Sequence, residues 1–170
     1  MYKRQLLNRL LKHPEMAGSA VLINEFGEIG LDHLLVEKLD EDTVLLNAGC
    51  LCCTIRGDLQ RALRDLALKV EAGQEIRRVL IETTGLADPA PILQTLMSDP
   101  VALRSFQLDG VVTLVDAVLG SATLDSQIEA VKQAAVADRL ILSKTDIATA
   151  DQVTALESRL RVLNPGAPIR

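Results

Sequence analysis

The chain has 170 residues, of which 48% are hydrophobic, and its 18 Lys and Arg against 23 Asp and Glu give a formal net charge of −5. A chain of this size buries enough surface to fold around a core without disulfide or metal staples, so we expect one domain. The acidic balance argues against nucleic acid as a partner, and 2% aromatic residues leave no base-stacking platform. No apolar stretch approaches the roughly 18–20 residues of a membrane helix, and the N-terminus lacks a signal-peptide core, so we expect a cytoplasmic protein without membrane contact.

Short β-branched and Leu-rich runs alternate along the chain with longer segments of helical period. Strands are predicted over residues 20–23, 43–46, 79–81, 111–115 and 140–142. Helices are predicted over residues 6–13, 59–70, 91–97, 127–136 and 151–163. The pattern predicts an α/β fold, with a mostly parallel sheet covered by helices on both faces. Functional residues are then expected in the loops that follow the carboxyl ends of the strands.

Both ends of the sequence lead us to expect a truncated domain. The first helical stretch starts at residue 6 without a cap or a preceding strand, and residues 1–5 read as a sequence foreign to it. Near the other end, residues 164–168 are rich in Pro and Gly. They fit either the close of a complete α/β domain or a connection to a second domain.

The loop after the first predicted strand carries two carboxylates, Glu25 and Glu28, and two glycines, Gly27 and Gly30. Carboxylates in a mobile loop can supply oxygen ligands, although this stretch alone is better explained as a solvated acidic loop.

Three cysteines, Cys50, Cys52 and Cys53, follow the second predicted strand within one turn. Their spacing is poor for a disulfide framework and favours a thiolate site for Zn²⁺, Cu⁺ or Co²⁺. The fourth ligand position is open to Glu25, Glu28, His33, water or a target protein. Buried small hydrophobic cysteines and a redox pair are the alternatives.

The third predicted strand ends in a carboxylate and a Thr-Gly turn, formed by Glu82, Thr84 and Gly85. A carboxylate at a strand end can hold Mg²⁺, and a glycine lets a backbone N–H approach a terminal phosphate. The alternative is a Gly turn in which Asp88-Pro89 starts a helix, but it leaves Glu82 at an apolar strand end unexplained.

The loop after the fifth predicted strand contains Ser143, Lys144 and Asp146. It resembles the Asn-Lys-x-Asp loop of GTP-binding proteins, where the Lys chain lies on the base and the carboxylate accepts from guanine N1 and N2. Ser143 stands where that motif has Asn. The alternative is a polar turn with Asp146 as a helix N-cap.

Together, these loops and the Leu114-Val115-Asp116-Ala117 strand end resemble, in order and spacing, the CobW-type P-loop GTPases, a metallochaperone family. The resemblance spans residue 6 to the end. It implies GTP and Mg²⁺ binding, slow hydrolysis, Zn²⁺ or Co²⁺ at the Cys-x-Cys-Cys site, and delivery to a client metalloprotein or to cobalamin synthesis. Glu28 joins the implied metal ligands, and a nucleotide-dependent homodimer is a further expectation.

The resemblance also implies two missing parts. The family opens with a Gly-x-x-x-x-Gly-Lys-Thr-Thr loop directly before a helix like residues 6–13, and its C-terminal domain would follow Arg170. We therefore expect residues 1–170 to be a single GTPase domain, incomplete at the N-terminus, and weak or inactive by itself. A non-hydrolysing metal-binding module and a thiol redox protein remain as alternatives.

Overall fold

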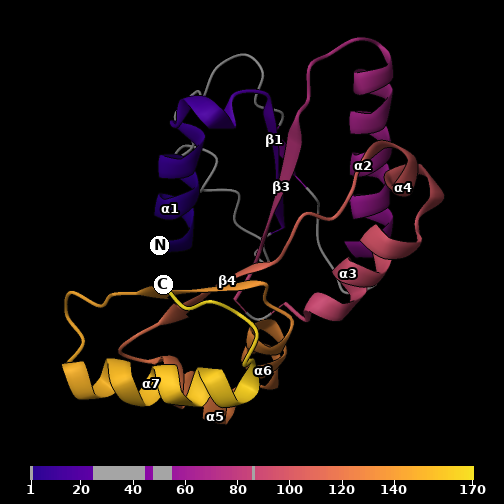
Figure 1. The fold of residues 1–170 in the computed structure, drawn as a ribbon. Helices are drawn as coiled ribbons and strands as arrows, with labels where there is room; N and C mark the ends of the chain where they lie inside the picture. The colour runs from indigo at the N-terminus through magenta and orange to yellow at the C-terminus, as the bar shows by residue number, and fades with distance from the viewer. Residues whose placement is uncertain (1, 25–44, 48–54, 86) are drawn as a thin grey trace. The chain divides into compact units, whose positions relative to one another are not determined.

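The computed structural model describes residues 2–24, 45–47, 55–85 and 87–170 (Figure 1). The chain divides into two compact units. The first comprises Met1–Thr84 and Ala90–Gln107, and the second comprises Gly85–Pro89 and Leu108–Arg170.

The first unit is built on a three-stranded parallel sheet in the order β2-β1-β3. The strands are β1 (Ser19–Asn24), β2 (Leu45–Asn47) and β3 (Arg78–Thr83). Its helical elements are α1 (Tyr2–Leu11), η1 (Pro14–Met16), α2 (Ile55–Glu71), α3 (Pro89–Ser98) and α4 (Pro100–Ser105). Figure 1 shows α1 and α2 on opposite sides of β1 and β3, as expected for a parallel sheet.

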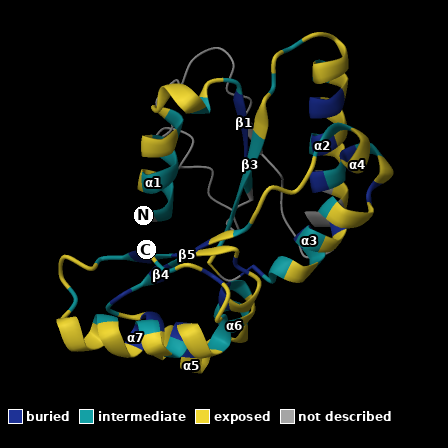
Figure 2. Ribbon diagram, in the orientation of Figure 1, coloured by how far each residue is buried: buried dark blue, intermediate teal, exposed yellow. Residues whose placement is uncertain are grey.

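The core of the first unit lies between the sheet and α2. Leu59, Leu63 and Leu66 recur at three- and four-residue spacing, so one face of α2 is apolar and buried. They pack with Ala20 and Leu22 of β1, and Figure 2 shows this buried face of α2 as a stripe along the helix.

The second unit pairs β4 (Val112–Asp116) in parallel with β5 (Arg139–Ser143). Three helices, α5 (Gly120–Ser126), α6 (Ile128–Ala135) and α7 (Ala150–Leu163), lie together on one side of β4 in Figure 1. Leu140, Leu156 and Leu160 are fully buried at the centre of this unit.

The predicted fold class is confirmed, because every described strand pairing is parallel and helices alternate with strands. The second strand extends one residue beyond its predicted end, to Asn47, and its predicted first residues 43 and 44 lie outside the described residues. The first helix begins at Tyr2, so residues 2–5 continue it. Two helices were not predicted, α4 and α5, because six and seven residues are too few to show a helical period.

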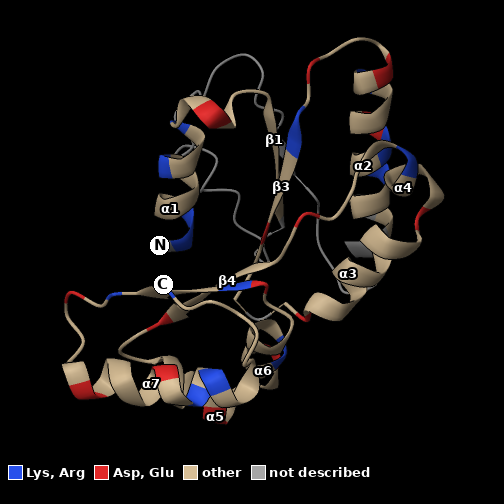
Figure 3. Cartoon of the chain, viewed as in Figure 1, with Lys and Arg blue, Asp and Glu red and all other residues tan. Residues whose placement is uncertain are grey.

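Figure 3 shows charged residues of both signs on α2 in the first unit and on α7 in the second. Among the described helices, none is both long enough and apolar enough to cross a bilayer.

Gly120 marks the closest approach of α5 to the core of the second unit. A Cβ there would lie 2.9 Å from Val115 Cγ1 and 3.1 Å from Leu156 Cδ2. We predict that Gly120→Ala lowers the free energy of unfolding by about 1–3 kcal/mol, because two buried side chains must move.

The measurement is urea unfolding followed by circular dichroism. The matched control is Gly57→Ala in α2, where nothing lies within 4 Å of the added Cβ. That variant is expected to gain up to about 1 kcal/mol from the better helix propensity of Ala. Equal stability of Gly120→Ala and wild type would contradict the packing described.

Candidate functional site

The carboxyl end of β3 meets the first turn of α1. Arg4 Nε lies 3.9 Å from Glu82 Oε2, and both side chains are mostly buried. The Lys3 ammonium donates a 2.6 Å hydrogen bond to the backbone carbonyl of Thr83. Two cations of α1 therefore lie at the strand end where the sequence predicted a metal-binding carboxylate.

At this end of β3, burial and charge pairing shift the pKa of Lys3 in opposite directions. Burial lowers the pKa of Lys3, and the neighbouring Glu82 carboxylate opposes that shift. The Glu82 Oε2 and Thr84 Oγ1 atoms are both buried. A carboxylate and a hydroxyl of this kind are the hard oxygen donors that Mg²⁺ prefers.

Gly85, the third residue predicted for this loop, is grouped with the second unit. Its backbone carbonyl accepts a 3.2 Å hydrogen bond from Gln133 Nε2 of α6. Asp88 pairs with Lys132 of the same helix at 2.5 Å. Helix α3 begins at Pro89, as the alternative interpretation of this turn expected.

Lys144 follows β5 directly and is held in an uncommon backbone conformation. Its φ of 61° lies in the left-handed region, which costs a non-glycine residue about 1–2 kcal/mol. The Lys144 ammonium forms an ion pair with the Asp116 carboxylate, which lies opposite Ser143 in the β4–β5 register. The N–H groups of Ile147 and Ala148 both donate to the Lys144 carbonyl, so the loop is a folded turn.

Asp116 makes several polar contacts at the end of β4. Its Oδ1 accepts from the N–H groups of Val118 at 2.9 Å and Leu119 at 3.1 Å. Burial raises the pKa of Asp116, but the hydrogen bonds from Lys144, Leu119 and Val118 outweigh burial and leave the pKa lowered. The carboxylate is thus held in its charged form.

Ser143 and Asp146 occupy different positions around Lys144. Ser143 Oγ donates to the Val115 carbonyl at 3.3 Å, tying the end of β5 to β4. Asp146 is exposed. It is not the cap of the next helix, because Thr149 caps α7 in a capping box with Gln152. The alternative interpretation of Asp146 as an N-cap is therefore wrong.

The predicted thiolate site lies outside the described residues. This holds for Cys50, Cys52, Cys53 and for the candidate ligands Glu28, Glu25 and His33. Within the described part of the chain, no cluster of three or more His, Cys, Asp or Glu could hold a metal ion.

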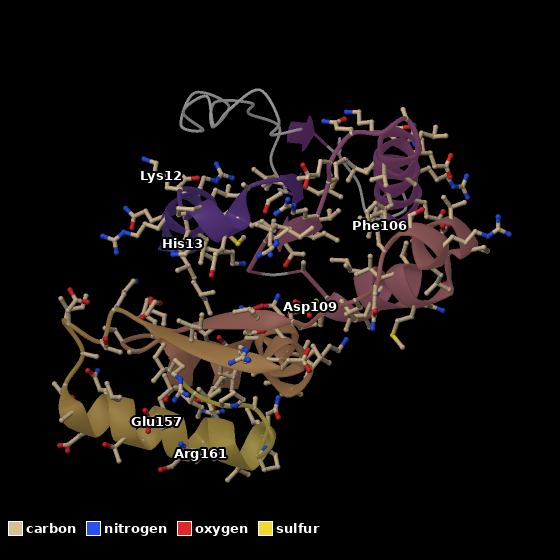
Figure 4. All side chains as sticks on the ribbon, turned by 45° about the horizontal axis from the view of Figure 1, so that its top comes forward. Lys12, His13, Phe106, Asp109, Glu157 and Arg161 are labelled. Atoms are coloured by element: carbon tan, nitrogen blue, oxygen red, sulfur yellow. The ribbon has the colours of Figure 1, made fainter. Side chains whose placement is uncertain are left out.

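His13 has a structural partner close in sequence. Its Nδ1 accepts a 3.3 Å hydrogen bond from the N–H of Glu15 and so caps η1. Figure 4 shows His13 next to Lys12 at the end of α1.

Residues 3–170 match the CobW/HypB/UreG nucleotide-binding domain. The chain belongs to this family. It is 38% identical over 168 residues to the zinc chaperone YjiA of Escherichia coli strain K12, covering 98% of this chain and 52% of YjiA. It is 31% identical to the zinc-regulated GTPase metalloprotein activator 1 of Schizosaccharomyces pombe, covering 95% of this chain and 40% of that protein.

Solved structures give the same assignment. The crystal structure of Zn(II)-bound YjiA GTPase from E. coli matches with a TM-score of 0.72 at 30% identity, over 99% of this chain and 52% of that chain. A Zn(II)-bound triple mutant of the same GTPase matches with a TM-score of 0.74. The fold is therefore that of a P-loop NTPase, as the resemblance implied, and the chain spans about half the length of YjiA.

Sequence reasoning assigned no role to three residues at these strand ends: Lys3, Arg4 and Asp116. The family motif ends in Lys-Thr-Thr directly before the first helical stretch, which puts its lysine at position 3. That signal was hidden because Arg4 and Gln5 stand where the motif has Thr-Thr. Asp116 was part of the resemblance, but its partner Lys144 is 28 residues away and only the strand pairing brings them together.

The Asp116 carboxylate makes the second unit sensitive to acid. Because its pKa in the folded state lies below the ordinary value of 3.8, its contribution is present above that value and is lost as pH falls through the folded pKa. We predict that Asp116→Asn is less stable than wild type at neutral pH, and that the difference shrinks as the pH falls below 3.8.

Urea unfolding at a series of pH values measures this difference. Asp109→Asn, at an exposed carboxyl of the same unit, is the control. A difference between Asp116→Asn and wild type that is constant over the whole pH range would contradict the role given to the carboxylate.

Proposed function

We propose that this chain is the GTP-binding part of a zinc metallochaperone, in which GTP hydrolysis is coupled to transfer of metal from a Cys-x-Cys-Cys site. The observation that carries the proposal is its match to the Zn(II)-bound YjiA GTPase over 99% of this chain. The names of the relatives as zinc chaperones and GTPase metalloprotein activators support the same class.

The guanine base is proposed to bind at the turn after β5. There the aliphatic chain of Lys144 lies on the base, the exposed Asp146 carboxylate accepts from N1 and N2, and Ser143 holds the turn to β4. Adenine lacks this pair of donors, and a carboxylate left unpaired against it is costly. The ion pair with Asp116 supports Lys144 in its left-handed conformation.

The phosphates are proposed to lie over the first turn of α1. Lys3 has the position of the motif lysine, and the N–H groups of a helix N-terminus favour an anion. Residues 1–17 contain no glycine, so the backbone cradle of the family loop is missing from this stretch. On this chain by itself we therefore propose weak nucleotide binding and little or no hydrolysis.

Glu82 and Thr84 fit a magnesium ion by the chemistry of their buried oxygen atoms. Bound there, Mg²⁺ would neutralise charge on the β- and γ-phosphate oxygens. The Gly85 backbone N–H is proposed to approach the terminal phosphate. We identify no general base, so hydrolysis rests on positioning and charge stabilisation and is slow.

The cargo metal is proposed to bind to Cys50, Cys52 and Cys53, with Glu28 as the fourth ligand and Glu25 or His33 as substitutes. Thiolates accept both Zn²⁺ and Co²⁺, and availability decides between them. The proposed recipient is a client metalloprotein or the cobalamin-synthesis machinery, in the cytoplasm. A homodimer formed with nucleotide bound completes the proposal.

Fluorescent nucleotides test the base preference. We predict that methylanthraniloyl-GDP binds at least about tenfold more tightly than methylanthraniloyl-ADP. Asp146→Asn should abolish this preference and improve binding of xanthosine diphosphate, whose 2-oxygen accepts from the new amide.

A matched variant carries a Gly-x-x-x-x-Gly segment directly before Lys3. It is expected to bind GTP about tenfold or more tightly than the present chain, because the backbone cradle is restored. Equal affinity of both forms for guanine and adenine nucleotides would contradict the proposal.

Cobalt titration tests the thiolate site. We predict that Co²⁺ gives a near-ultraviolet thiolate-to-cobalt charge-transfer band, that each of Cys50→Ala, Cys52→Ala and Cys53→Ala weakens it, and that Zn²⁺ displaces it. Glu28→Gln should change the visible ligand-field bands and keep the charge-transfer band. Reversible oxidation of the thiols with no metal-dependent band would support a redox protein instead.

A further inference from the structure

The segment Gly85–Pro89 is attached to the second unit, although the residues on either side of it, Thr84 and Ala90, are grouped with the first. Five residues have little core of their own. Side chains of the second unit also contact this segment.

Two neighbouring side chains of α6 make these contacts. Gln133 Nε2 donates to the backbone carbonyls of Gly85 at 3.2 Å and Ala87 at 2.7 Å. Lys132 Nζ lies 2.5 Å from Asp88 Oδ2. The lysine pair is exposed, and exposed pairs contribute little, so the amide of half-buried Gln133 is the main attachment.

Helix α6 is itself fixed within the second unit. Thr113 Oγ1 of β4 donates to the Gln133 carbonyl at 2.8 Å, and Ala134 is 1% exposed. Asn164 Nδ2, after α7, donates to the carbonyls of Ala134 at 3.0 Å and Ala137 at 2.8 Å. The Gln133 amide is thus carried by a helix that is itself held in place, so it can hold the Gly85 and Ala87 carbonyls in fixed positions.

We propose that Gln133 is the positioning residue of Gly85 and Ala87, and that its two hydrogen bonds set the directions of their backbone carbonyls. A peptide group is planar, so fixing the Ala87 carbonyl also fixes the direction of the Asp88 N–H. The positioning rests on the contacts alone. Its consequence, a turn held in place for contact with a terminal phosphate, rests on the proposed function.

The test measures backbone order by ¹⁵N relaxation on the whole chain without nucleotide. In wild type, Gly85 and Ala87 should have order parameters near about 0.85, and in Gln133→Met these should fall below about 0.6. Methionine keeps the length of the side chain and removes the amide donors. Order parameters of Leu140 and Leu142 in β5 should not change.

Three further variants separate the contributions. Gln133→Asn keeps the amide on a shorter chain and should also loosen the segment, which provides a second reading if Gln133→Met does not fold. Gln133→Glu sets an acceptor against the two carbonyls and should loosen it at neutral pH. Lys132→Gln removes the exposed ion pair alone and should leave the order parameters of Gly85 and Ala87 within error of wild type.

Unchanged order at Gly85 and Ala87 in folded Gln133→Met and Gln133→Asn would overturn the proposal. A non-hydrolysable GTP analogue adds a separate outcome. If wild type binds it, Gln133→Met should lose about tenfold of the preference for the analogue over GDP, because only the former has the terminal phosphate. If wild type binds neither nucleotide, the proposed function fails while the order-parameter result still decides the role of Gln133.

Discussion

Parallel strand pairing is the constraint on which both candidate strand ends depend. Asn24 lies opposite Thr83 in the β1–β3 register, and Asp116 lies opposite Ser143 in the β4–β5 register. Alternate residues such as Leu140 and Leu142 are buried, and a slip of one residue would turn them to the other face. Burial therefore fixes the register, and the register decides which polar side chains leave neighbouring strands together. The candidate binding residues therefore lie where the buried apolar part of each strand ends.

Each of these strand ends carries a carboxylate that already has a cationic partner from a neighbouring element. Glu82 has Arg4 of α1, and Asp116 has Lys144 after β5. Neither carboxylate is therefore left as a buried charge without a partner in the absence of a ligand. A ligand that binds there replaces or shares an existing partner, which keeps the cost of burying charge low. At β5 this pairing supports a strained backbone at Lys144, whereas at β3 it brings a helix N-terminus to the strand. The same kind of ion pair thus lies at the proposed base-binding turn of one unit and at the proposed phosphate-binding strand end of the other.

The sequence predicted the interiors of the strands and longer helices well, because their hydrophobic patterns are local. It missed α4, although Asp99 directly before Pro100 accepts from the N–H groups of Val101 and Ala102 and forms a recognisable cap. The loops with Glu82 and Lys144 were predicted because they follow the carboxyl ends of predicted strands. The contacts of Gln133 with Gly85 and of Lys3 with Thr83 join residues 48 and 80 positions apart, and no local pattern encodes them. The cysteine motif remains a prediction from residue type and spacing.

Coupling between nucleotide binding and metal binding is what distinguishes the proposed metallochaperone from a simple metal-binding module. Such coupling requires that the two ligands change each other's affinity. The most direct measurement is the Zn²⁺ affinity of the protein, by competition with a chelator, with a non-hydrolysable GTP analogue bound and with GDP bound. The account predicts that the two affinities differ by about fivefold or more. Equal Zn²⁺ affinities with both nucleotides bound would contradict it.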